Sequence, residues 1–333
     1  MSKEFELWQF IAGRLEQNEN VMLLVVAESS GSSPGRQGYK MAVGKDGELC
    51  GSIGGGVMEV NLVELAGQIL SAPSAVTSSS TSIVKRQIHR KTPDSPSGMI
   101  CSGEQTVILR LLSSPDAKKI DTIIDAARHR TEAFLTINSK SFNAGPPEGG
   151  TQNAPEKLKA YFIFEKESGG DFIFRERLGP NNDLYIIGGG HCALALSEVM
   201  SKMDFHLHIF DDRPDLNTIS KNRFADDITI IEDYVKIGDL IPSGSNTYVV
   251  VMTLGYRSDE IVIRQLIDND FKYFGVLGSR AKMATLMTSL KKEGFDAGRL
   301  DCIRAPIGIP INSRTPEEIA VSIAAEIIAV KNG

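Results

Sequence analysis

The sequence predicts an α/β protein in which an N-terminal mixed α+β domain, residues 1–180, is followed by a C-terminal Rossmann-like parallel-sheet domain, residues 181–333. The length of 333 residues suits two domains. In the second half, short apolar runs alternate with helical segments, which is typical of a parallel sheet. The first of these runs ends in a turn of the form G-x-G-x-x-A, with Gly188, Gly190 and Ala193 at the fixed positions, as in dinucleotide-binding folds.

Composition and charge exclude several classes of protein. Hydrophobic residues make up 41% of the chain, which allows a sizeable core. The net charge of -6 argues against a general nucleic-acid surface. No apolar run approaches membrane-spanning length, and the N-terminus lacks a signal-peptide pattern. Four scattered cysteines without a CxxC pair indicate a reduced, cytoplasmic protein.

The first domain is expected to mix helices, strands and turns. Apolar residues at helical spacing predict helices over residues 4–18 and 116–130, and another helix opens from a glycine cluster at 51–59. Residues 71–96, rich in Ser, Thr and Pro, are expected to be irregular, and residues 143–156 to form a mobile loop. Strands are predicted at residues 21–27, 39–43, 106–112, 133–137, 161–165 and 172–175.

Two glycine-rich, hydroxyl-bearing loops lie close together in this domain's sequence. One spans residues 29–38, and the other contains Gly54-Gly55-Gly56. Together, such loops can offer many backbone N–H donors to an anion. For either loop alone, a tight turn without a ligand is the favoured interpretation.

The turn Gly188-Gly189-Gly190-His191 has the flanking elements that the dinucleotide fingerprint requires. A strand of buried character precedes it at residues 184–187, and an apolar helical face follows it. The glycines allow a phosphate to approach the backbone, and the helix N-terminus supplies N–H groups and partial positive charge. The alternative is a Rossmann-type unit that binds nothing.

A second strand of this unit ends in acids. Asp212 or Asp211 is placed to accept a hydrogen bond from a ribose-like hydroxyl, about 20 residues beyond the glycines. Arg213 lies beside them and is available for a phosphate. Either acid can fill this role on sequence grounds.

The remaining part of the second domain continues the alternation. Strands are predicted at residues 228–231, 248–252 and 273–277. The last leads to Ser279, Arg280 and Lys282 at a helix start, where a hydroxyl and two cations either hold a second anionic group or act as a cap and solvated charges. A capping box at Thr315-Pro316-Glu317-Glu318 opens a final helix that packs on the core.

The five histidines form no helical HExxH pattern. His206 and His208 are expected to share one face of a strand, where packing is a commoner role than metal binding. A protein-ligated zinc or iron site is therefore not expected.

Short motifs follow one another in a fixed order along almost the whole chain. In the first domain they are Gly31-Ser32-Ser33-Pro34-Gly35-Arg36, residues 51–59, and Gly98-Met99-Ile100-Cys101. In the second they are residues 187–193, Asp212-Arg213, Gly278-Ser279-Arg280, and Pro306-Ile307-Gly308 leading into residues 315–320. Together these motifs resemble the XdhC/CoxI family, the accessory proteins of xanthine dehydrogenase and related molybdenum hydroxylases.

The resemblance implies a function that composition does not indicate. Such proteins bind molybdenum cofactor, as molybdopterin or its nucleotide form, support its sulfuration, and insert it into the apo-hydroxylase. It further implies the apo-xanthine dehydrogenase or a related molybdenum hydroxylase as partner, a cysteine desulfurase as a second partner, and a homo-oligomer. The implied cofactor-binding residues are Cys101, Gly54, Gly55, Gly56, Gly188, Gly189, Gly190, His191, Asp212, Arg213, Ser279 and Arg280.

Cys101 is the expected contact to molybdenum. It lies between turn-forming residues just before a strand, so an exposed thiol is expected there, and a thiolate is a soft ligand. The alternative is a small, inert turn residue; the family motif that centres on this cysteine favours the functional interpretation. Cys192 is the rival, because a helix N-terminus is expected to lower its pKa.

Two positions depart from the family pattern. Cys101-Ser102-Gly103 stands where the family has Cys-Gly-Gly. The turn at residues 253–259 lacks the histidine that the family commonly has there, so Tyr256 or Arg257 must substitute or the role is lost.

Two other functions compete with that of a cofactor-binding maturation factor, which is not itself a redox catalyst. An NAD(P)-dependent oxidoreductase fits the glycine turn equally well, but the chain shows no Ser-x-x-x-Tyr-x-x-x-Lys arrangement. A purely structural assembly partner is the third. Ligand binding separates the third from the others, and NAD(P)H turnover separates the second from the first.

Overall fold

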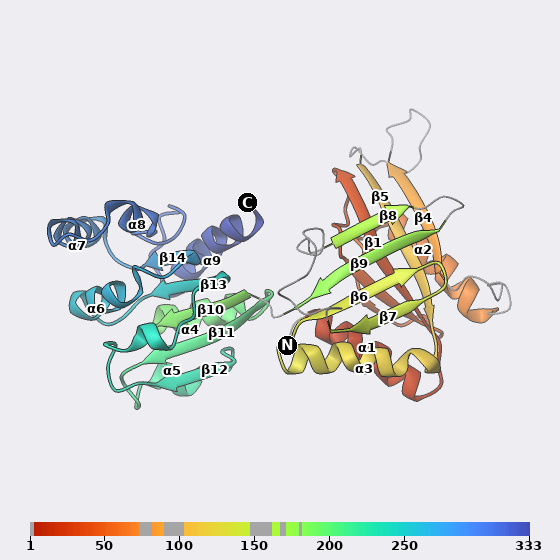
Figure 1. Cartoon of the computed structure of the whole chain (residues 1–333), viewed down its shortest axis with the longest axis horizontal. Helices are drawn as coiled ribbons and strands as arrows, with labels where there is room; N and C mark the ends of the chain where they lie inside the picture. Colours follow the sequence, from red (N-terminus) through yellow and green to blue (C-terminus); the bar gives the residue numbers. More distant parts are fainter. Residues whose placement is uncertain (1–2, 73–81, 90–102, 147–161, 167–170, 180–181) are drawn as a thin grey trace. The chain divides into compact units, whose positions relative to one another are not determined.

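The structure is a computed structural model that describes residues 3–72, 82–89, 103–146, 162–166, 171–179 and 182–333. The chain divides into two compact units, Lys3–Pro180 and Asn181–Gly333 (Figure 1). The first unit mixes antiparallel sheets with helices, and the second contains a parallel sheet, which confirms the predicted fold class.

The first unit contains two antiparallel sheets. The five-stranded sheet has the order β3-β2-β1-β5-β4, and the four-stranded sheet has the order β7-β6-β9-β8. The strands are β1 (Val21–Gly31), β2 (Lys40–Gly44), β3 (Leu49–Gly51), β4 (Ser82–His89), β5 (Gly103–Leu112), β6 (Ala133–Asn138), β7 (Phe142–Gly145), β8 (Phe162–Lys166) and β9 (Phe172–Leu178). The helical segments are α1 (Lys3–Glu16), α2 (Gly56–Ser71), η2 (Ser114–Asp116) and α3 (Ala117–Arg128).

Both faces of β1 are buried from Val21 to Ala27, which explains the continuous apolar sequence of that part of the strand. Val21, Leu23 and Val25 point into one core with α1, α3 and the four-stranded sheet. Met22 and Leu24 point into a second core that α2 covers. Because successive strand residues alternate between faces, a strand between two cores carries no polar face.

Two expectations for the first unit need correction. Residues 82–89 lie inside the stretch expected to be irregular, yet they form β4 and pair antiparallel with β5 from Ser82↔Arg110 to His89↔Gly103. The expected mobile loop begins inside β7, which pairs with β6. In both places a short strand is stabilised by its neighbour in the sheet, a contact that local composition does not reveal.

The second unit is built on a five-stranded parallel sheet with the order β12-β11-β10-β13-β14. This order reverses between β10 and β13, which is the topological switch point of a Rossmann-like sheet. The strands are β10 (Asn182–Ile187), β11 (Phe205–Asp211), β12 (Asp227–Ile230), β13 (Gly244–Val251) and β14 (Phe271–Val276). The helical segments are α4 (His191–Met200), α5 (Asn217–Lys221), η4 (Ile237–Asp239), α6 (Tyr256–Leu266), α7 (Arg280–Lys292), α8 (Ala297–Cys302) and α9 (Pro316–Asn332).

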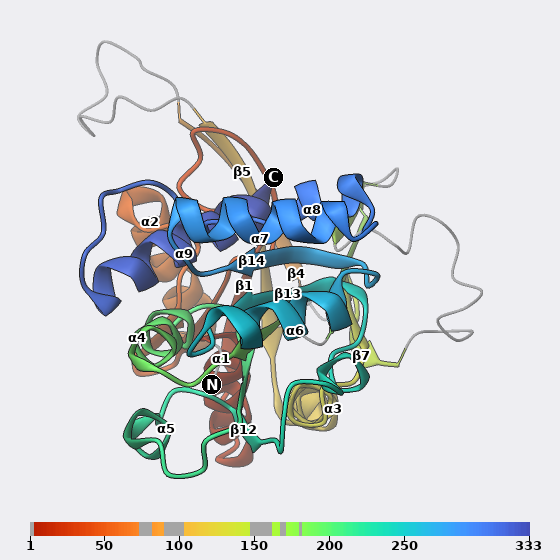
Figure 2. The ribbon, with the colours of Figure 1, turned by 90° about the vertical axis from the view of Figure 1, so that its left-hand side faces the viewer.

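Helices cover both faces of this sheet, as Figure 2 shows. Helices α4 and α9 pack on one face, and α6, α7 and α8 pack on the other. Thr315 caps α9 by accepting a hydrogen bond from the backbone N–H of Glu318, and the Glu318 carboxylate completes the predicted capping box. In the part of the chain that the structure describes, no helix has both the length and the apolar character needed to cross a bilayer.

Candidate functional site

The carboxyl edge of the parallel sheet carries the predicted glycine turn. Gly188 has a φ of 106°, and a Cβ there would clash with the carbonyl oxygen of Met252, the residue directly after β13. The backbone N–H of Gly188 donates to the Phe210 carbonyl oxygen at 2.8 Å. The turn is thus bound to the ends of both neighbouring strands, and only glycine fits at its first position.

The carboxylate of Asp211, at the end of β11, is hydrogen-bonded to the glycine turn itself. Its buried carboxylate accepts hydrogen bonds from the backbone N–H of Gly189 at 2.6 Å and from the Arg213 guanidinium at 2.9 and 2.7 Å. The Thr218 hydroxyl donates a hydrogen bond to the Gly189 carbonyl oxygen at 2.5 Å. Asp211 therefore holds the turn in place and is not presented to a ligand hydroxyl.

Asp212 is the acid that faces outward. Its side chain is 39% exposed, and its carboxylate accepts a hydrogen bond from the Tyr234 hydroxyl at 3.2 Å. Arg213 Nε lies 3.8 Å from the same carboxylate. Burial and the nearby charges of Asp211 and Asp212 raise the pKa of Tyr234, so its hydroxyl stays protonated and can donate this bond. Asp212 is thus oriented and still accessible.

The N-terminus of α4 is open next to the turn. Gly190 is the residue before the helix, no side chain caps it, and a Cβ built there meets nothing within 4 Å. His191 begins the helix and is exposed. Uncapped N–H groups and the helix dipole make such an end suitable for an anion.

The expectation of a lowered pKa for Cys192 is wrong. Burial, followed by the charge of Glu317, raises the pKa of this thiol. Burial disfavours the charged thiolate, and the nearby carboxylate disfavours it further. Cys192 also packs against the core under α4 and α9.

The loops after β13 and β14 are connected by an ion pair. Asp259, buried in the first turn of α6, accepts hydrogen bonds from the Thr253 hydroxyl at 2.5 Å and from Lys282 Nζ at 2.7 Å. Ser279 caps α7 by accepting a bond from the Lys282 backbone N–H at 3.3 Å, and Arg280 is exposed. Ser279 is thus a helix cap, whereas Lys282 fixes the relative positions of two helix N-termini.

The turn that lacks the family histidine begins α6. Gly255 precedes the helix without a side-chain cap, Tyr256 is half-buried and Arg257 is exposed. Both possible substitutes therefore lie at the start of a helix on the carboxyl edge. Sequence reasoning missed Asp259; an acid in the first turn of a helix was the available signal.

Two backbone N–H groups of the glycine loop at residues 52–55 are hydrogen-bonded to a carboxylate of the same chain. Glu59, in the first turn of α2, accepts hydrogen bonds from the backbone N–H of Ile53 at 2.9 Å and of Gly55 at 3.0 Å. The Ser52 hydroxyl donates to the same oxygen at 2.8 Å. Gly54 packs against the backbone of Gly35, so the two glycine-rich loops of this unit do meet.

Cys101, the predicted molybdenum contact, lies outside the described residues. The next described residue, Gly103, packs so closely on the backbone of Ser33 that a Cβ would clash there. The first-unit glycine loops and the start of β5 are therefore in contact.

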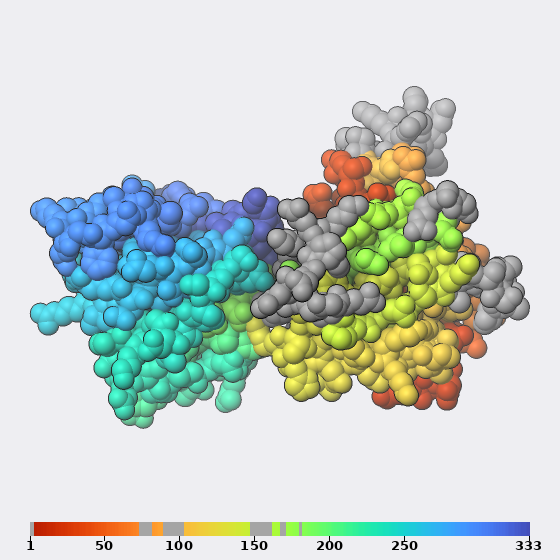
Figure 3. All heavy atoms as spheres, viewed as in Figure 1, coloured from red at the N-terminus to blue at the C-terminus, as the bar shows by residue number. Residues whose placement is uncertain are grey.

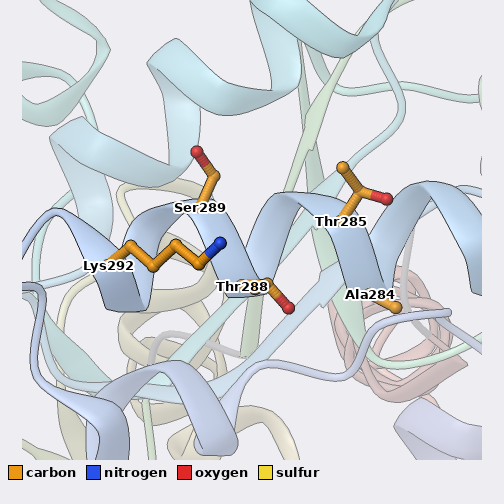
Figure 4. A pocket seen from close by; sticks show the side chains of 5 residues that line it. All are labelled: Ala284, Thr285, Thr288, Ser289 and Lys292. Carbon is orange, nitrogen blue, oxygen red and sulfur yellow. The ribbon is translucent and has the colours of Figure 1, made fainter.

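A surface depression elsewhere on the second unit carries none of this chemistry. It lies along α7 and is lined by Ala284, Thr285, Thr288, Ser289 and Lys292 (Figure 4). These side chains come from one helix, and none of the predicted site residues is among them.

Comparisons with known proteins match both units. Residues 184–327 match the family model described as the XdhC Rossmann domain, and residues 14–78 match the model of the XdhC and CoxI family. A Bacillus subtilis protein described as a probable xanthine dehydrogenase subunit is 24% identical over 336 residues, with 95% of each chain covered. The uncharacterized protein YqeB of Escherichia coli is 25% identical over 162 residues, which are 48% of this chain and 29% of that protein.

The chain thus spans less than a third of YqeB and nearly all of the Bacillus subtilis relative. A crystal structure described as a xanthine dehydrogenase from Bacillus halodurans has the same fold, with a TM-score of 0.75 and 22% identity. The match covers 100% of this chain and 96% of the Bacillus halodurans chain.

Proposed function

Because this chain belongs to the XdhC and CoxI family, we propose that it is an accessory protein that matures xanthine dehydrogenase or a related molybdenum hydroxylase. In this proposal it binds molybdenum cofactor as cargo, supports its sulfuration and inserts it into the apo-hydroxylase. The name of the Bacillus subtilis relative, a probable xanthine dehydrogenase subunit, supports the association with that enzyme. A cysteine desulfurase as second partner and self-association belong to the same proposal.

The observation that carries the proposal is the open, uncapped start of α4. The cargo carries phosphate, and the N–H groups beyond Gly190 are placed to bind it. The backbone N–H of Gly189 is not available, because Asp211 accepts its hydrogen bond. Gly190 and His191 therefore contact the phosphate in this proposal, while Gly188 and Gly189 shape the turn.

Two neighbouring side chains suit the rest of such a ligand. Asp212 is accessible and oriented by Tyr234, so it can accept a hydrogen bond from a pterin or ribose N–H or O–H group. Arg280 is exposed at the start of α7 and supplies positive charge on the same edge of the sheet. An accessible carboxylate and a positive charge at this edge therefore suit a heterocyclic ligand that carries phosphate. Molybdopterin, with or without an attached nucleotide, is such a ligand.

Cys101 remains the proposed contact to the metal. The soft thiolate is the ligand type that suits molybdenum, which is the part of the cargo that undergoes sulfuration. The contribution of the first-unit loop Gly54-Gly55-Gly56 is less direct, because Glu59 already accepts bonds from the backbone N–H groups of Ile53 and Gly55.

The NAD(P)-dependent alternative rests on the same turn and on the Rossmann strand order. The acid that would bind a ribose in that case is Asp212, since Asp211 is buried in contacts within the protein. Turnover of NAD(P)H therefore decides between the two functions.

The test compares Gly190→Val with the parent protein. Open space around Gly190 lets the variant fold, while the added side chain blocks the approach of a phosphate. We expect mass spectrometry of small molecules released from the purified protein to show molybdopterin or its nucleotide in the parent and a loss of at least about tenfold in the variant, since a residue of this turn contacts the phosphate directly. Activation of an apo-hydroxylase should fall in parallel.

Gly145→Val is the matched control, because Gly145 in β7 also has nothing within 4 Å of a built Cβ. This variant should retain the cofactor. Equal retention in the folded Gly190→Val protein would place the site elsewhere, and release of NAD(P) with steady turnover would favour the oxidoreductase. Cys101→Ser is expected to lose activation while it stays folded; full activity would leave the thiol without a role.

A further inference from the structure

Two histidines and an aspartate meet on the outer strands of the second unit's sheet. His206 and His208 are two residues apart in β11, so their side chains lie on the same face of the sheet. Asp227 is the first residue of the edge strand β12. Strand register places His208 directly beside Asp227. The turquoise segment that holds β12 lies at the surface in Figure 3, and all four of its residues are exposed.

The donor atoms of these three residues already converge. One ligand atom from each residue can be chosen so that all lie within 4.8 Å of one another. His208 Nδ1 is 3.3 Å from Asp227 Oδ2, and His206 Nε2 is 2.6 Å from the same oxygen. In a tetrahedral site with bonds of about 2.0–2.1 Å, donor atoms are separated by about 3.3–3.4 Å. The pair of His208 and Asp227 has this spacing already. The pair of His206 and Asp227 would reach it if the two atoms moved slightly apart.

A second set of contacts orients His208. Its other ring nitrogen, Nε2, lies 2.9 Å from Asp183 Oδ1, on the neighbouring strand β10. The Tyr185 ring stacks on the imidazole, with centroids 4.5 Å apart and an interplanar angle of 7°. A carboxylate on the far nitrogen fixes the tautomer that leaves Nδ1 as a lone-pair donor, which is the usual support of a metal-binding histidine.

We propose that His206, His208 and Asp227 form a binding site for one divalent transition-metal cation of the zinc class. Two imidazoles and a carboxylate favour such ions over Mg²⁺ or Ca²⁺, which select oxygen ligands. Asp226 Oδ2 lies 3.7 Å from His206 Nδ1 and adds negative charge beside the site. The exposed side of β12 leaves a coordination position for water or for a group from another molecule.

This site is separate from the glycine turn. His206 precedes Asp211 by five residues in β11, which corresponds to about 16 Å along the strand. The metal would connect β11 to the short edge strand β12 and so stabilise that edge. The inference does not depend on the molybdenum cofactor, and its test requires none.

The experiment uses the full chain, freed of any purification tag and treated with chelator, in a Cys302→Ser background because Cys302 is an exposed free cysteine and such a thiol can also bind zinc. Cobalt absorption and zinc competition measure stoichiometry and affinity, and thermal unfolding is followed with and without zinc. We expect one ion per chain and a higher unfolding temperature with zinc.

Each of His206→Asn and His208→Asn should weaken binding more than about tenfold, because each removes a ligand. Asp183→Asn should weaken it about 10–100-fold while the cobalt spectrum keeps its shape, since Asp183 is a positioning residue that acts through His208. His129→Asn, at the C-terminal end of α3 in the first unit, is the matched control and should bind zinc like the parent.

Failure of the parent to bind zinc with saturation would overturn the proposal. Undiminished binding in the folded double variant His206→Asn/His208→Asn would do the same. If that double variant does not fold in the presence of chelator, Asp227→Asn is measured in its place. The Asp227 side chain is 57% exposed, so this mild substitution should not disturb folding. Unchanged affinity in Asp227→Asn would equally contradict the assignment.

Discussion

The carboxylate of Asp211 accepts a hydrogen bond from the backbone N–H of Gly189 at 2.6 Å. Arg213 pairs with the same carboxylate, so the acid is enclosed by groups of its own chain. In dinucleotide-binding folds the acid after the second strand binds the ribose. Here that position fixes the glycine turn, and the next residue, Asp212, remains accessible to a ligand.

This arrangement predicts the behaviour of Asp211→Asn. The amide keeps an acceptor for Gly189 but removes the charge that faces Arg213, so the second unit should lose about 1–3 kcal/mol of unfolding free energy at pH 7. Urea unfolding followed by circular dichroism measures this loss. Asp212→Asn, which alters an accessible carboxylate, is the control and should change stability by less than about 0.5 kcal/mol.

The same variant has a defined pH signature. Burial tends to raise the pKa of Asp211, but hydrogen bonds from Arg213 and from the Gly189 backbone outweigh it and hold the pKa below its ordinary value of 3.8. A lowered pKa means that the stabilisation is complete above 3.8 and is lost as the pH falls through the folded-state value. The difference between the two proteins should therefore shrink at low pH; a constant difference down to about pH 2 would show that the charge is not responsible.

An internal carboxylate also occupies the first-unit loop, which gives a second prediction. Glu59→Ala removes the acceptor shared by Ser52, Ile53 and Gly55, so the first unit should lose about 1–3 kcal/mol. Sulfate should recover part of this loss by binding the vacated donors. Trp8, the single tryptophan, is buried in this unit and reports its unfolding by fluorescence.

Glu64→Ala is the control, because Glu64 is an exposed acid on the same helix. Its response to sulfate should match that of the parent. If Glu59→Ala responds no more strongly than Glu64→Ala, the loop does not bind anions even when its own carboxylate is removed.

The parallel sheet could be predicted because its signal is local. Residues 184–187 and 248–252 are continuous apolar runs, since helices cover both faces of β10 and β13. The capping box at Thr315 was also readable, because its two partners are three residues apart. Such features depend on neighbours in sequence.

The choice of partners within the site could not be predicted. Asp211 and Gly189 are 22 residues apart, and Lys282 and Asp259 are 23 apart, so these contacts exist only after the strands align. Likewise, the helix position of Cys192 suggested a lowered pKa, whereas burial under a distant helix raises it. The meeting of His208 with Asp227 depends on strand register in the same way.

The thiols should differ in reactivity, which is the third prediction. Burial raises the pKa of both Cys192 and Cys50, so each holds little thiolate at neutral pH, whereas Cys302 is exposed. Iodoacetamide at about pH 7.5 should therefore modify Cys302 before Cys192 and Cys50, as followed by peptide mass spectrometry. Faster modification of Cys192 would restore it as a reactive thiol and as a rival of Cys101.

The last prediction concerns a buried ion pair that joins the two sheets of the first unit. Lys40, on β2, places Nζ 2.5 Å from the carboxylate of Glu176, on β9, and 2.7 Å from that of Glu4. The side chains of Lys40 and Glu176 are each only 6% exposed. Lys40→Met leaves the Glu176 carboxylate buried without its main cation, so the unit should lose about 3–5 kcal/mol.

The pH dependence of that loss identifies its cause. Burial raises the pKa of Glu176 above its ordinary value of 4.5, against the attraction of Lys40. Because the folded state then holds a proton that the unfolded state has released, stability falls as the pH rises above 4.5. Lys40→Met removes the opposing attraction and raises the pKa of Glu176 further, so the fall should extend to higher pH in Trp8 fluorescence titrations. Lys40→Met/Glu176→Gln has no carboxylate to titrate and should recover part of the stability with a flatter profile. A Lys40→Met protein with the pH profile of the parent would mean that Glu176 reaches water once its partner is gone.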